Sequence, residues 1–513
     1  MFPILSVTLF APLLGAILIM VIPREDEKTI QRVGIAFAFL TILLTAFIWV
    51  GVAQEGADVM QFQEQYPWIP AFNVTYHLGA DGLSAPLLFL TALLTTLSLF
   101  YSAYTIKDRV KEYFFLFLLL QMGMFGVFMA LDLVLFYVFW EIGLVPMFLL
   151  IGVWGGKRRL YAAIKFFLFT LVGSVFMLLA IIGVYFQTGT FSIPEVAEFV
   201  ATQQPLFAAV PGIATAAFWA FFIAFAIKVP SFPFHTWLPD AHTEAPTAGS
   251  VILAGILLKL GAYGLIRITL PFFPDQFNYF STTVPIIPIM AVMSIVYGAL
   301  VCMAQWDLKR LIAYSSVAHM GYVTLGLAAA AAGVGMFGED IYLNAAASGI
   351  NGAAFQMFAH GIITGGLFFL VGIIYERAHT RDLKAFGGLG SQVPYYYGVM
   401  LVTGFASLGL PGLAGFWSEF FVFRGTVRFI PVAAFISVLG VVFTAAYILW
   451  KIVQYVFLGE LDKEKWGTLT DMEWWEKVTM WPLIVTMLFL GFYPTPLLDM
   501  FNAATTALLN NLR

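Results

Sequence analysis

The sequence predicts an all-α integral membrane protein with about fourteen membrane-spanning helices. Of its 513 residues, 61% are hydrophobic and only 11% are charged, against about 25% charged residues in average soluble proteins. So few charges could not cover the surface of a soluble fold. The apolar runs are long and do not alternate with polar residues, and the bilayer core admits only helices and closed barrels. We therefore expect helices rather than a barrel.

Each predicted span is an apolar run of about 20 residues, the length that crosses the hydrocarbon core. Only Asp132 divides the fourth run from the fifth, and the tail at 499–513 is too polar to span. The first run lacks a basic leader and a small-residue cleavage site, so we interpret it as a span rather than a removable signal. The runs are 3–22, 30–53, 82–104, 113–131, 133–153, 162–187, 212–234, 246–271, 284–304, 309–332, 342–375, 394–423, 431–457 and 478–498.

The lysine and arginine residues predict how the chain is oriented in the membrane. Loops after odd-numbered spans, together with the first residues of the spans that follow them, hold 17 of the 25 basic residues, whereas loops after even-numbered spans and the tail hold only Arg424, Arg428 and Arg513. Cytoplasmic loops carry the excess of basic residues. We therefore expect the odd-numbered loops in the cytoplasm and both chain ends on the opposite side.

The composition also excludes several classes of function. The net charge is −4 and the chain has no basic tail, so nucleic acid is not expected as a partner. Cys302 is the only cysteine, and one cysteine cannot build an iron–sulfur cluster, a four-cysteine zinc site or a disulfide. The sequence contains no phosphate-binding loop, dinucleotide fingerprint or paired nucleophile and base. We expect no redox or hydrolytic chemistry within the chain.

Two predicted spans are interrupted by proline in the same way. Span seven runs into Lys228-Val-Pro-Ser-Phe-Pro233, and span twelve carries Leu408-Gly-Leu-Pro-Gly-Leu-Ala-Gly415. Such breaks survive in a membrane only when they are buried in protein or face a wet cavity. The breaks are five spans apart, and an odd offset is typical of inverted repeats; the alternative is two unrelated prolines. We expect four regions, namely the first three spans at 1–112, one five-helix repeat at 113–271, its inverted counterpart at 284–457, and the last helix and tail at 478–513.

Three charged residues lie within predicted spans, where a charge costs about 2.5–3.5 kcal/mol on insertion scales. Glu141 is near the middle of span five, Lys228 lies one turn before the break in span seven, and Lys259 is central in span eight. We expect Glu141 and Lys228 to form an intramembrane ion pair, whose separation would release a proton. Lys259 has no acidic residue within a helical turn, so it is poised to give up a proton. The alternatives are a structural carboxylate and lysines that extend to the membrane surface.

Two histidines and a second glutamate extend this series. His319 and His360 lie on spans ten and eleven, and histidine titrates near neutral pH. Glu419 follows the break in span twelve and is the positional counterpart of Lys228. The alternatives are histidines that only join helices and a carboxylate that faces water at a helix end. A metal site is weaker, because no ligand spacing such as HxxxH is present. The chemistry that the six residues can perform together is proton transfer.

Three other charges and one loop are less informative. Lys165, Lys451 and Arg267 lie nearer the ends of their spans, and we expect their side chains to reach the membrane surface. The polar segment His235–Glu244 carries two histidines. It is either the cytoplasmic mouth of a proton path or a plain connection, and the sequence leaves both interpretations open.

Several segments resemble the antiporter-like membrane subunits of respiratory complex I, the NADH-quinone oxidoreductase. They are FWEIGLVPMFLLIGVWGG, KVPSFPFHTWLPDAHTEAPTAGSVILAGILLKLGAYGL, DLKRLIAYSSVAHMGYV and PGLAGFWSEF. The resemblance spans nearly the whole chain and is strongest between about 130 and 425. The AHTEAPTAGSV segment and the glutamate of GFWSEF resemble the M-type (chain 4) members most. L-type and N-type relatives and multisubunit sodium/proton antiporters typically place lysine at that terminal position.

The resemblance implies a fourteen-helix subunit with two inverted five-helix units that pumps protons for an NADH:quinone reductase. The chain would hold no redox centre itself, and NADH, FMN, iron–sulfur clusters and quinone are expected on other subunits. The implied roles are Glu141 as the ion-pair glutamate, Lys228 as its partner, Lys259 as the central lysine, His319 and His360 as bridging histidines, and Glu419 as the terminal glutamate.

The resemblance also implies partners and a location. The expected partners are the L-type and N-type antiporter-like subunits, membrane lipids and protons. The expected location is the bacterial inner membrane, with both termini on the periplasmic side. A subunit of a multisubunit cation/proton antiporter and the M-type subunit of a photosynthetic, ferredoxin-dependent complex stay open as alternatives. A transporter for an organic solute is weaker, because the polar residues are strung along the membrane plane rather than gathered at one point.

Overall fold

The computed structural model describes residues 2–512 and is mainly helical. Twelve helices in this part of the chain are long and apolar enough to cross a membrane, and a bent pair of helices raises the total to as many as thirteen. The chain is therefore a multi-pass membrane protein. The twelve spans are α1 (Ile4–Val21), α2 (Glu27–Glu55), α3 (Ser84–Thr105), α4 (Val110–Met129), α5 (Leu133–Ile142) with α6 (Leu144–Trp154), α7 (Arg159–Thr188), α9 (Pro211–Lys228), α11 (Thr247–Ile252) through η2 (Leu253–Leu257), α12 (Leu258–Gly264) and η3 (Leu265–Thr269) to α13 (Leu270–Phe272), α15 (Ile286–Ala304), α16 (Leu308–Ala332), α17 (Asp340–Ala378), and α21 (Pro431–Tyr447) with η5 (Ile448–Phe457).

Shorter elements connect or follow these spans. The bent pair consists of α23 (Trp474–Phe492) and α24 (Thr495–Asn510). The remaining elements are β1 (Gln61–Ile69), η1 (Pro70–Phe72), β2 (Val74–Ala80), α8 (Ile193–Thr202), α10 (Trp237–Glu244), α14 (Pro274–Thr282), η4 (Leu383–Ala385), α18 (Leu389–Gln392), α19 (Pro394–Leu408), α20 (Ala414–Phe429) and α22 (Lys463–Trp466).

The predicted total of fourteen spans is one or two higher than the helix lengths support. The predicted span at 394–423 consists of two helices, α19 with 15 residues and α20 with 16, and each is shorter than the roughly 20 residues that cross the hydrocarbon core. The predicted last span at 478–498 is bent, because α23 and α24 meet at 71°. The tail that the sequence predicts to be too polar to span is largely the helix α24.

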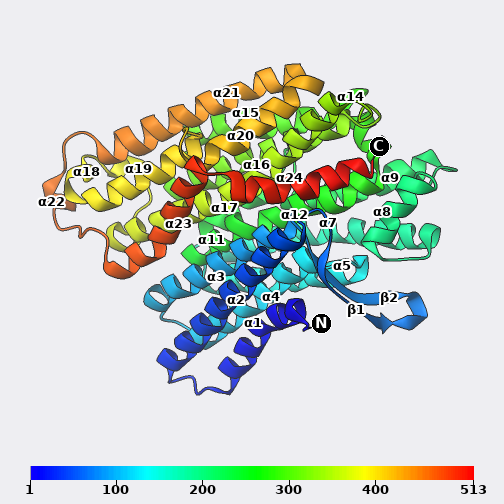
Figure 1. Cartoon of the computed structure of the whole chain (residues 1–513). Helices are drawn as coiled ribbons and strands as arrows, with labels where there is room; N and C mark the ends of the chain where they lie inside the picture. Colours follow the sequence, from blue (N-terminus) through cyan, green and yellow to red (C-terminus); the bar gives the residue numbers. More distant parts are fainter. Residues whose placement is uncertain (1, 513) are drawn as a thin grey trace.

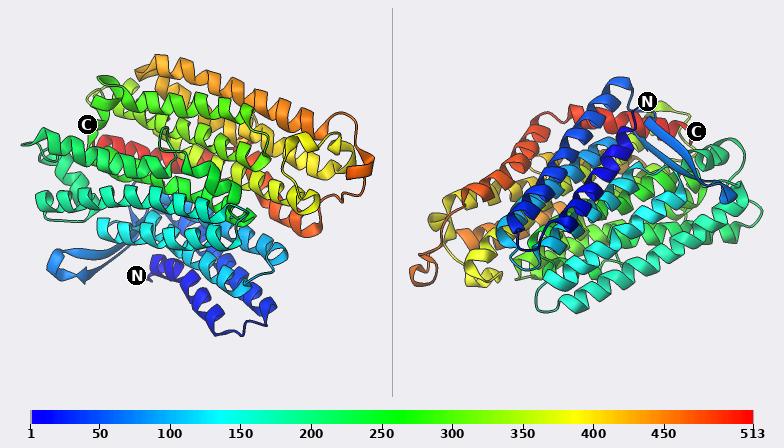
Figure 2. Two further views of the ribbon diagram at one scale, coloured as in Figure 1. Left: turned by 180° about the vertical axis from the view of Figure 1, so that it is seen from behind. Right: turned by 90° about the horizontal axis from the view of Figure 1, so that it is seen from below.

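The spans lie side by side in one bundle, with the connections gathered at its two ends (Figure 1). The hairpin β1–β2, α8 and α14 lie at one end, and α18 and α22 lie at the other. Both chain ends lie at the hairpin end, and the views from behind and from below agree (Figure 2). We call the hairpin end the outer end and the α18–α22 end the inner end.

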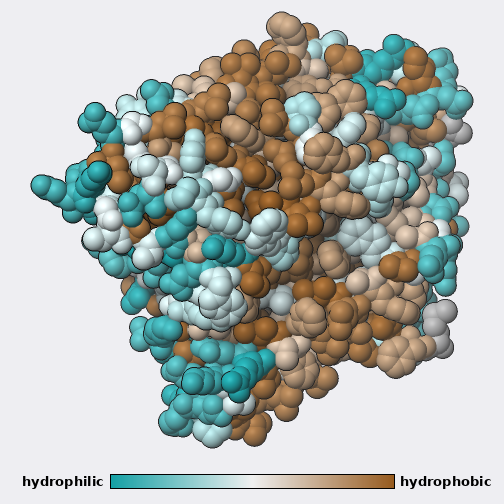
Figure 3. All heavy atoms as spheres, turned by 60° about the vertical axis from the view of Figure 1, so that its left-hand side comes forward, coloured by the Kyte–Doolittle hydropathy of each residue, from teal (hydrophilic) through white to brown (hydrophobic). Residues whose placement is uncertain are grey.

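The surface carries an apolar belt between the two ends. Figure 3 shows hydrophobic residues across the middle of one face, with hydrophilic residues gathered toward the edges. Large apolar side chains on α7 and α21 are strongly exposed, and Phe186 and Phe435 are each 82% exposed. A soluble protein rarely exposes an apolar patch of this extent. The belt is the surface that lipid or neighbouring subunits cover.

The outer end carries a two-stranded antiparallel hairpin that the sequence analysis does not predict. Strands β1 and β2 pair with each other, and Glu64 of β1 reaches the first turn of α1. Its carboxylate accepts hydrogen bonds from the backbone N–H of Leu5 at 2.8 Å and of Ser6 at 3.2 Å. A carboxylate at a helix N-terminus satisfies free N–H groups and complements the helix dipole. The hairpin therefore fixes the start of the first span.

The predicted division at Asp132 is confirmed, and this residue also joins three parts of the outer end. Its Oδ1 accepts hydrogen bonds from Val134 and Leu135 N–H and so caps α5. Its Oδ2 accepts from the backbone N–H and the hydroxyl of Thr75 on β2. Asp132 also forms an isolated bridge with Ser192, ahead of α8. Burial raises the pKa of Asp132, and the hydrogen bonds oppose that shift.

We predict that Asp132→Ala loosens the hairpin locally. The substitution removes the cap of α5 and both bonds to β2, and loss of a cap costs about 1–2 kcal/mol. Amide hydrogen exchange of residues 74–80 in the assembled complex should quicken by roughly tenfold. Asp26→Ala is the matched control, because Asp26 also caps a helix but bonds only Thr29. Unchanged exchange over β2 in Asp132→Ala would contradict this role.

Candidate functional site

The six predicted site residues come from six elements of the bundle. Five of them are buried, with exposed fractions between 0% for Lys259 and 8% for Glu419, and Glu141 is half-buried. The elements are α5 for Glu141, α9 for Lys228, α12 for Lys259, α16 for His319, α17 for His360 and α20 for Glu419.

Lys259 lies at the centre of its span between two π-helical segments, η2 and η3. π-Helical turns inside α-helices occur often at functional sites. The Lys259 ammonium group donates to the Ala254 carbonyl at 2.5 Å and lies 2.6 Å from His360 Nδ1. Within residues 2–512, no carboxylate oxygen lies within 4.0 Å of this nitrogen. The direct polar partner of Lys259 on another helix is therefore a histidine rather than an acid.

The line continues from His360 through His319 to Glu419. The two imidazole rings have centroids 5.9 Å apart, and His360 Nε2 has no hydrogen-bond partner in the described structure. His319 Nδ1 lies 3.7 Å from Glu419 Oε1, and His319 Nε2 lies 3.1 Å from the Ser407 hydroxyl. Four of the six predicted residues are thus in sequence along one line, on α12, α17, α16 and α20.

A small cavity lies along this line. It has a volume of about 10 Å³, and its lining includes His319, His360 and Glu419 together with Gln356 and Ser407. About 10–15 Å³ is the least volume that holds one water molecule. The polar atoms around it could bind such a water. The site therefore has room for about one bridging water rather than a wide aqueous channel.

Sequence analysis missed the polar neighbours that hold this line. Gln356, one turn before His360, donates from Nε2 to the His319 carbonyl at 3.4 Å. Its Oε1 accepts a hydrogen bond from Ser418, next to Glu419. Gln356 thus links three of the elements that carry the site. The sequence could have indicated Gln356, because it lies four residues before His360 and residues i and i+4 share one helix face.

The broken backbone before α20 makes room for Glu419. Gly409 ends α19 with φ +78°, a left-handed conformation that favours glycine. A Cβ on Gly409 would lie 2.8 Å from Glu419 Oε2. Gly415 is packed even more closely, because a Cβ there would overlap the Ala406 carbonyl oxygen. The glycines that interrupt the predicted span twelve therefore let a carboxylate approach the chain break.

Lys228 differs from its prediction in position and in partner. It is the last residue of α9, so the break follows it directly rather than one turn later. The predicted contact ion pair with Glu141 is absent, since the described ion pairs within 4.0 Å do not include these two residues. The ammonium group instead lies 5.0 Å from the centroid of the Trp140 ring. A cation over an indole face is stabilised by the ring quadrupole.

Lys228 and Lys259 lie on helices in close contact. A Cβ on Gly261 would lie 2.9 Å from the Cβ of Lys228 and 2.6 Å from the Phe225 carbonyl. The absence of a side chain at Gly261 therefore permits this close approach of the two helices. Glu141 acts on Lys228 through its charge without touching it, and Glu141 Oε1 is buried without a hydrogen-bond partner.

The segment His235–Glu244 is largely helical rather than a plain loop. His242 of α10 is fully buried and stacks on Phe368, with ring centroids 4.6 Å apart. Neither of its ring nitrogens has a hydrogen-bond partner within the described residues. Burial lowers the pKa of His242, and the charges of Lys309 and Lys259 act in the same direction. His242 is therefore a buried titratable group near enough to both lysines for their charges to act on it.

The three charges expected to reach the membrane surface are each held by a partner. Lys165 pairs with Asp240 at 2.7 Å. Lys451 is fully buried, donates to the Gln305 carbonyl at 2.8 Å and lies over the Trp306 ring. Arg267 pairs with Asp81. These partners lie outside the long spans, at the ends of the bundle, so the extension of the three side chains toward the membrane surface stays a prediction.

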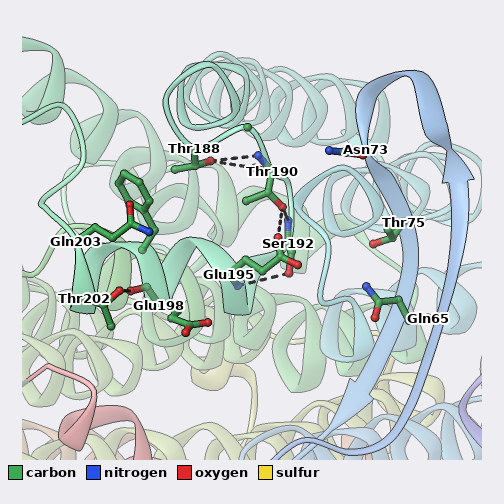
Figure 4. A pocket seen from close by; sticks show the side chains of 12 residues that line it. Gln65, Asn73, Thr75, Thr188, Thr190, Ser192, Glu195, Glu198, Thr202 and Gln203 are labelled. Atoms are coloured by element: carbon green, nitrogen blue, oxygen red, sulfur yellow. Dashed lines mark hydrogen bonds between the residues drawn. The ribbon is translucent and has the colours of Figure 1, made fainter.

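The outer end also carries a polar groove, which contains none of the six residues (Figure 4). It has a volume of about 640 Å³ and lies between the hairpin and α8. Its hydrogen bonds are local: Thr190 donates to Glu195, and the Ser192 hydroxyl accepts from Glu195 N–H at the start of α8. These bonds cap a helix and close a turn. The groove is therefore separate from the buried line in its position and its chemistry.

Comparison with known proteins agrees with this arrangement. The family described as NADH:quinone oxidoreductase/Mrp antiporter, TM, matches residues 130–444. NADH-quinone oxidoreductase subunit M of Rhodobacter capsulatus is 43% identical over 99% of this chain and 96% of its own length. The same subunit of Rickettsia prowazekii is 40% identical over 99% of both chains.

A solved structure gives the same result. A chain of respiratory complex I from Thermus thermophilus with bound NADH superposes with a TM-score of 0.86 at 30% identity. The alignment covers 99% of this chain and all of that one. The match includes the breaks and the helices that carry Lys259, His319, His360 and Glu419. The chain therefore belongs to the family of NADH:quinone oxidoreductase and Mrp antiporter membrane subunits.

Proposed function

We propose that this chain is the M-type membrane subunit of an NADH-quinone oxidoreductase and that it translocates protons across the membrane. Its full-length similarity to subunit M proteins supports the assignment. The observation that carries the proton-translocating role is the sequence of contacts from Lys259 through His360 and His319 to Glu419. The chain is thus part of an enzyme whose NADH, FMN, iron–sulfur and quinone sites lie on other subunits.

The central transfer begins at Lys259. A protonated lysine donates from Nζ to His360 Nδ1 at 2.6 Å, which is hydrogen-bond distance. Imidazole accepts a proton on one ring nitrogen and releases one from the other. His360 Nε2 has no other partner to hold its proton. The geometry therefore suits proton transfer from Lys259 to His360. A water in the small cavity between the two imidazole rings would then carry the proton to His319.

The outer transfer ends at Glu419. A proton on His319 reaches the carboxylate across the 3.7 Å separation of Nδ1 and Oε1, and the Ser407 hydroxyl orients the imidazole from its other nitrogen. A carboxylate that receives a proton becomes neutral, which favours it in the low dielectric of the interior. Glu419 is thus the last buried group before release toward the outer end.

Uptake from the cytoplasm is assigned to the inner end. Lys309 donates to the Ala245 carbonyl, and it follows the predicted cytoplasmic loop. His242 is near enough to this lysine and to Lys259 for the charges of both to act on it. We assign the mouth of the uptake path to α10 and the first turn of α16.

The gap between Glu141 and Lys228 is the proposed control point. When the two residues approach, the Glu141 carboxylate stabilises the protonated form of Lys228. When they separate, this stabilisation weakens. A change in that charge alters the field at Lys259 across the contact at Gly261. Electron transfer in other subunits would shift the balance between the two states.

The two proline breaks support an arrangement of inverted repeats, with units at 113–271 and 284–457 between the regions 1–112 and 478–513. The first break follows α9 and the second follows α19. Each break lies beside a charged group, Lys228 in the first case and Glu419 in the second. Discontinuous helices at the midplane are typical of inverted-repeat transporters.

The half-buried position of Glu141 supports a protein partner on the face of α5 and α6. An ionisable group at membrane depth is expensive when it faces lipid. We assign this face to the neighbouring L-type or N-type antiporter-like subunits. We assign the chain to the bacterial inner membrane with both termini periplasmic, since both chain ends lie at the outer end and basic loops mark the cytoplasmic side.

The central role of Lys259 can be tested in the parent complex. Lys259→Met should lower NADH-driven proton pumping by roughly tenfold or more, because it removes the donor to His360. The measurement is the pH gradient formed by purified complex in liposomes, with NADH oxidation followed in parallel. Lys451→Met is the matched control, since Lys451 is equally buried but touches Trp306 and Gln305 instead. Undiminished pumping in the Lys259 variant would rule out this function.

The chain break offers a second test. Gly409→Ala should lower pumping severalfold, because the added methyl would displace the Glu419 carboxylate. Gly412→Ala is the control, as its φ of +90° imposes a similar backbone strain while its Cβ meets only Phe492 at 3.5 Å. Pumping coupled to NADH oxidation is measured for both variants in equal amounts of assembled complex. Equal losses in the two variants would assign the effect to strain and exclude displacement of Glu419.

A further inference from the structure

Span eight carries a second polar row that leads away from the proton line. Lys259, Tyr263 and Arg267 are spaced four residues apart, so they share one face of the span. The row runs toward the outer end, where Arg267 meets Asp81 at the junction of β2 and α3. The rise between Lys259 and Arg267 is about 12 Å, at 1.5 Å per residue. This row leads from the central lysine toward the outer end of the span.

We propose that the Arg267–Asp81 pair is a barrier that keeps protons from passing in either direction between Lys259 and the outer end along this row. The pair thereby directs them through His360 instead. This inference rests on the proposed proton-translocating function. It assigns a role in the direction of transfer to two residues outside the line itself.

The contacts of the row leave no group free to relay a proton. The Tyr263 hydroxyl donates to the Phe128 carbonyl at 3.1 Å and accepts from Arg267 Nε at 3.3 Å. A backbone carbonyl cannot pass a proton onward. Arginine is always charged and has no acceptor. Tyr263 therefore cannot relay a proton from Lys259 toward Arg267.

Asp81 is equally occupied. Its Oδ1 accepts from the backbone N–H of Leu83 and Ser84 at 3.0 Å and so stabilises the start of α3. Its Oδ2 accepts from Arg267 Nη2 at 2.5 Å. The side chains of Arg267 and Asp81 are only 13% and 5% exposed. Both oxygens are thus engaged, and the pair is sealed from bulk water.

The orientation of the pair adds an electrostatic barrier. Arg267 lies on the span, and Asp81 lies beyond it at the outer end, so a proton that leaves Lys259 meets the guanidinium first. Because the Asp81 carboxylate lies against the guanidinium, the pair is neutral overall and acts on a proton at Lys259 only as a dipole, so its repulsion of that proton is a minor part of the barrier. Asp81 keeps the guanidinium fixed at that place. The positive end of the pair thus faces Lys259.

A small cavity lies beside the Arg267–Asp81 pair. Asp81 and Arg267 line a cavity of about 10 Å³ together with Thr505 and Leu508 of α24. This volume is close to the least that admits one water. Loss of the charged pair would leave a polar gap beside it, where water could join Tyr263 to the outer surface.

The barrier is tested with a neutral replacement of the pair. The double variant Asp81→Asn with Arg267→Gln keeps an acceptor for Leu83 and Ser84 N–H and keeps two side chains that can bond each other. Parent and variant complexes are reconstituted into liposomes, and decay of an imposed pH gradient is followed without NADH. We expect severalfold faster decay in the variant, with NADH oxidation retained but little gradient formed. Decay at the parent rate with a full NADH-driven gradient would overturn the proposal.

Two further variants separate the outcomes. Arg377→Gln with Glu476→Gln neutralises another buried pair, which joins α17 to α23 at the inner end, and its gradient should decay at the parent rate. Adding Lys259→Met to the neutral Asp81–Arg267 variant should slow the leak again, because the row then has no titratable group at its inner end. A leak that persists without Lys259 would refute the barrier, whereas pumping that survives Lys259→Met alone would refute the proposed function.

Discussion

The structure depends on one constraint, which is that the bilayer core offers no water to a charge or an open backbone group. Every such group must find its partner inside the protein. Lys259 satisfies this need through the Ala254 carbonyl, five residues earlier in the π-helical turn, and through His360. The contacts that make the lysine tolerable at this depth are therefore the contacts through which we propose that it passes a proton. Stability and function use the same hydrogen bonds.

Close contact between helices places these partners within reach. Gly326 and Gly349 let α16 and α17 touch, since a Cβ on Gly326 would overlap the Gly349 carbonyl. Gly352 and Gly425 do the same for α17 and α20. Small residues at such contacts let backbones approach, which is how membrane helices associate without a hydrophobic driving force. The spacing of His319, His360 and the Glu419 carboxylate thus follows from glycines that carry no chemistry themselves.

Sequence reasoning found the spans, the breaks and the central residues because charge and proline inside an apolar run are local signals. It could not find which groups meet. Lys259 and His360 are 101 residues apart in the chain, and His319 and Ser407 are 88 apart. The hairpin was missed because its strands, of nine and seven residues, mix polar and apolar side chains between two longer apolar runs. The aromatic partner of Lys451 was missed because Trp306 lies far away in the sequence, in the connection between α15 and α16. Pairing across helices depends on packing, and one sequence does not reveal packing.

A line of proton-transfer groups that was always complete would collapse the gradient it serves, so at least one step must be conditional. Two places in the structure can supply that condition. Lys228 and Glu141 form no contact ion pair within the described residues. The two histidines are separated by a cavity that holds about one water. A sub-ångström shift of α9 against α12, transmitted at Gly261, would alter both, because packed interfaces move between discrete arrangements rather than deform continuously. The tight contact between the two lysine-bearing helices is what would make proton transfer depend on events elsewhere in the complex.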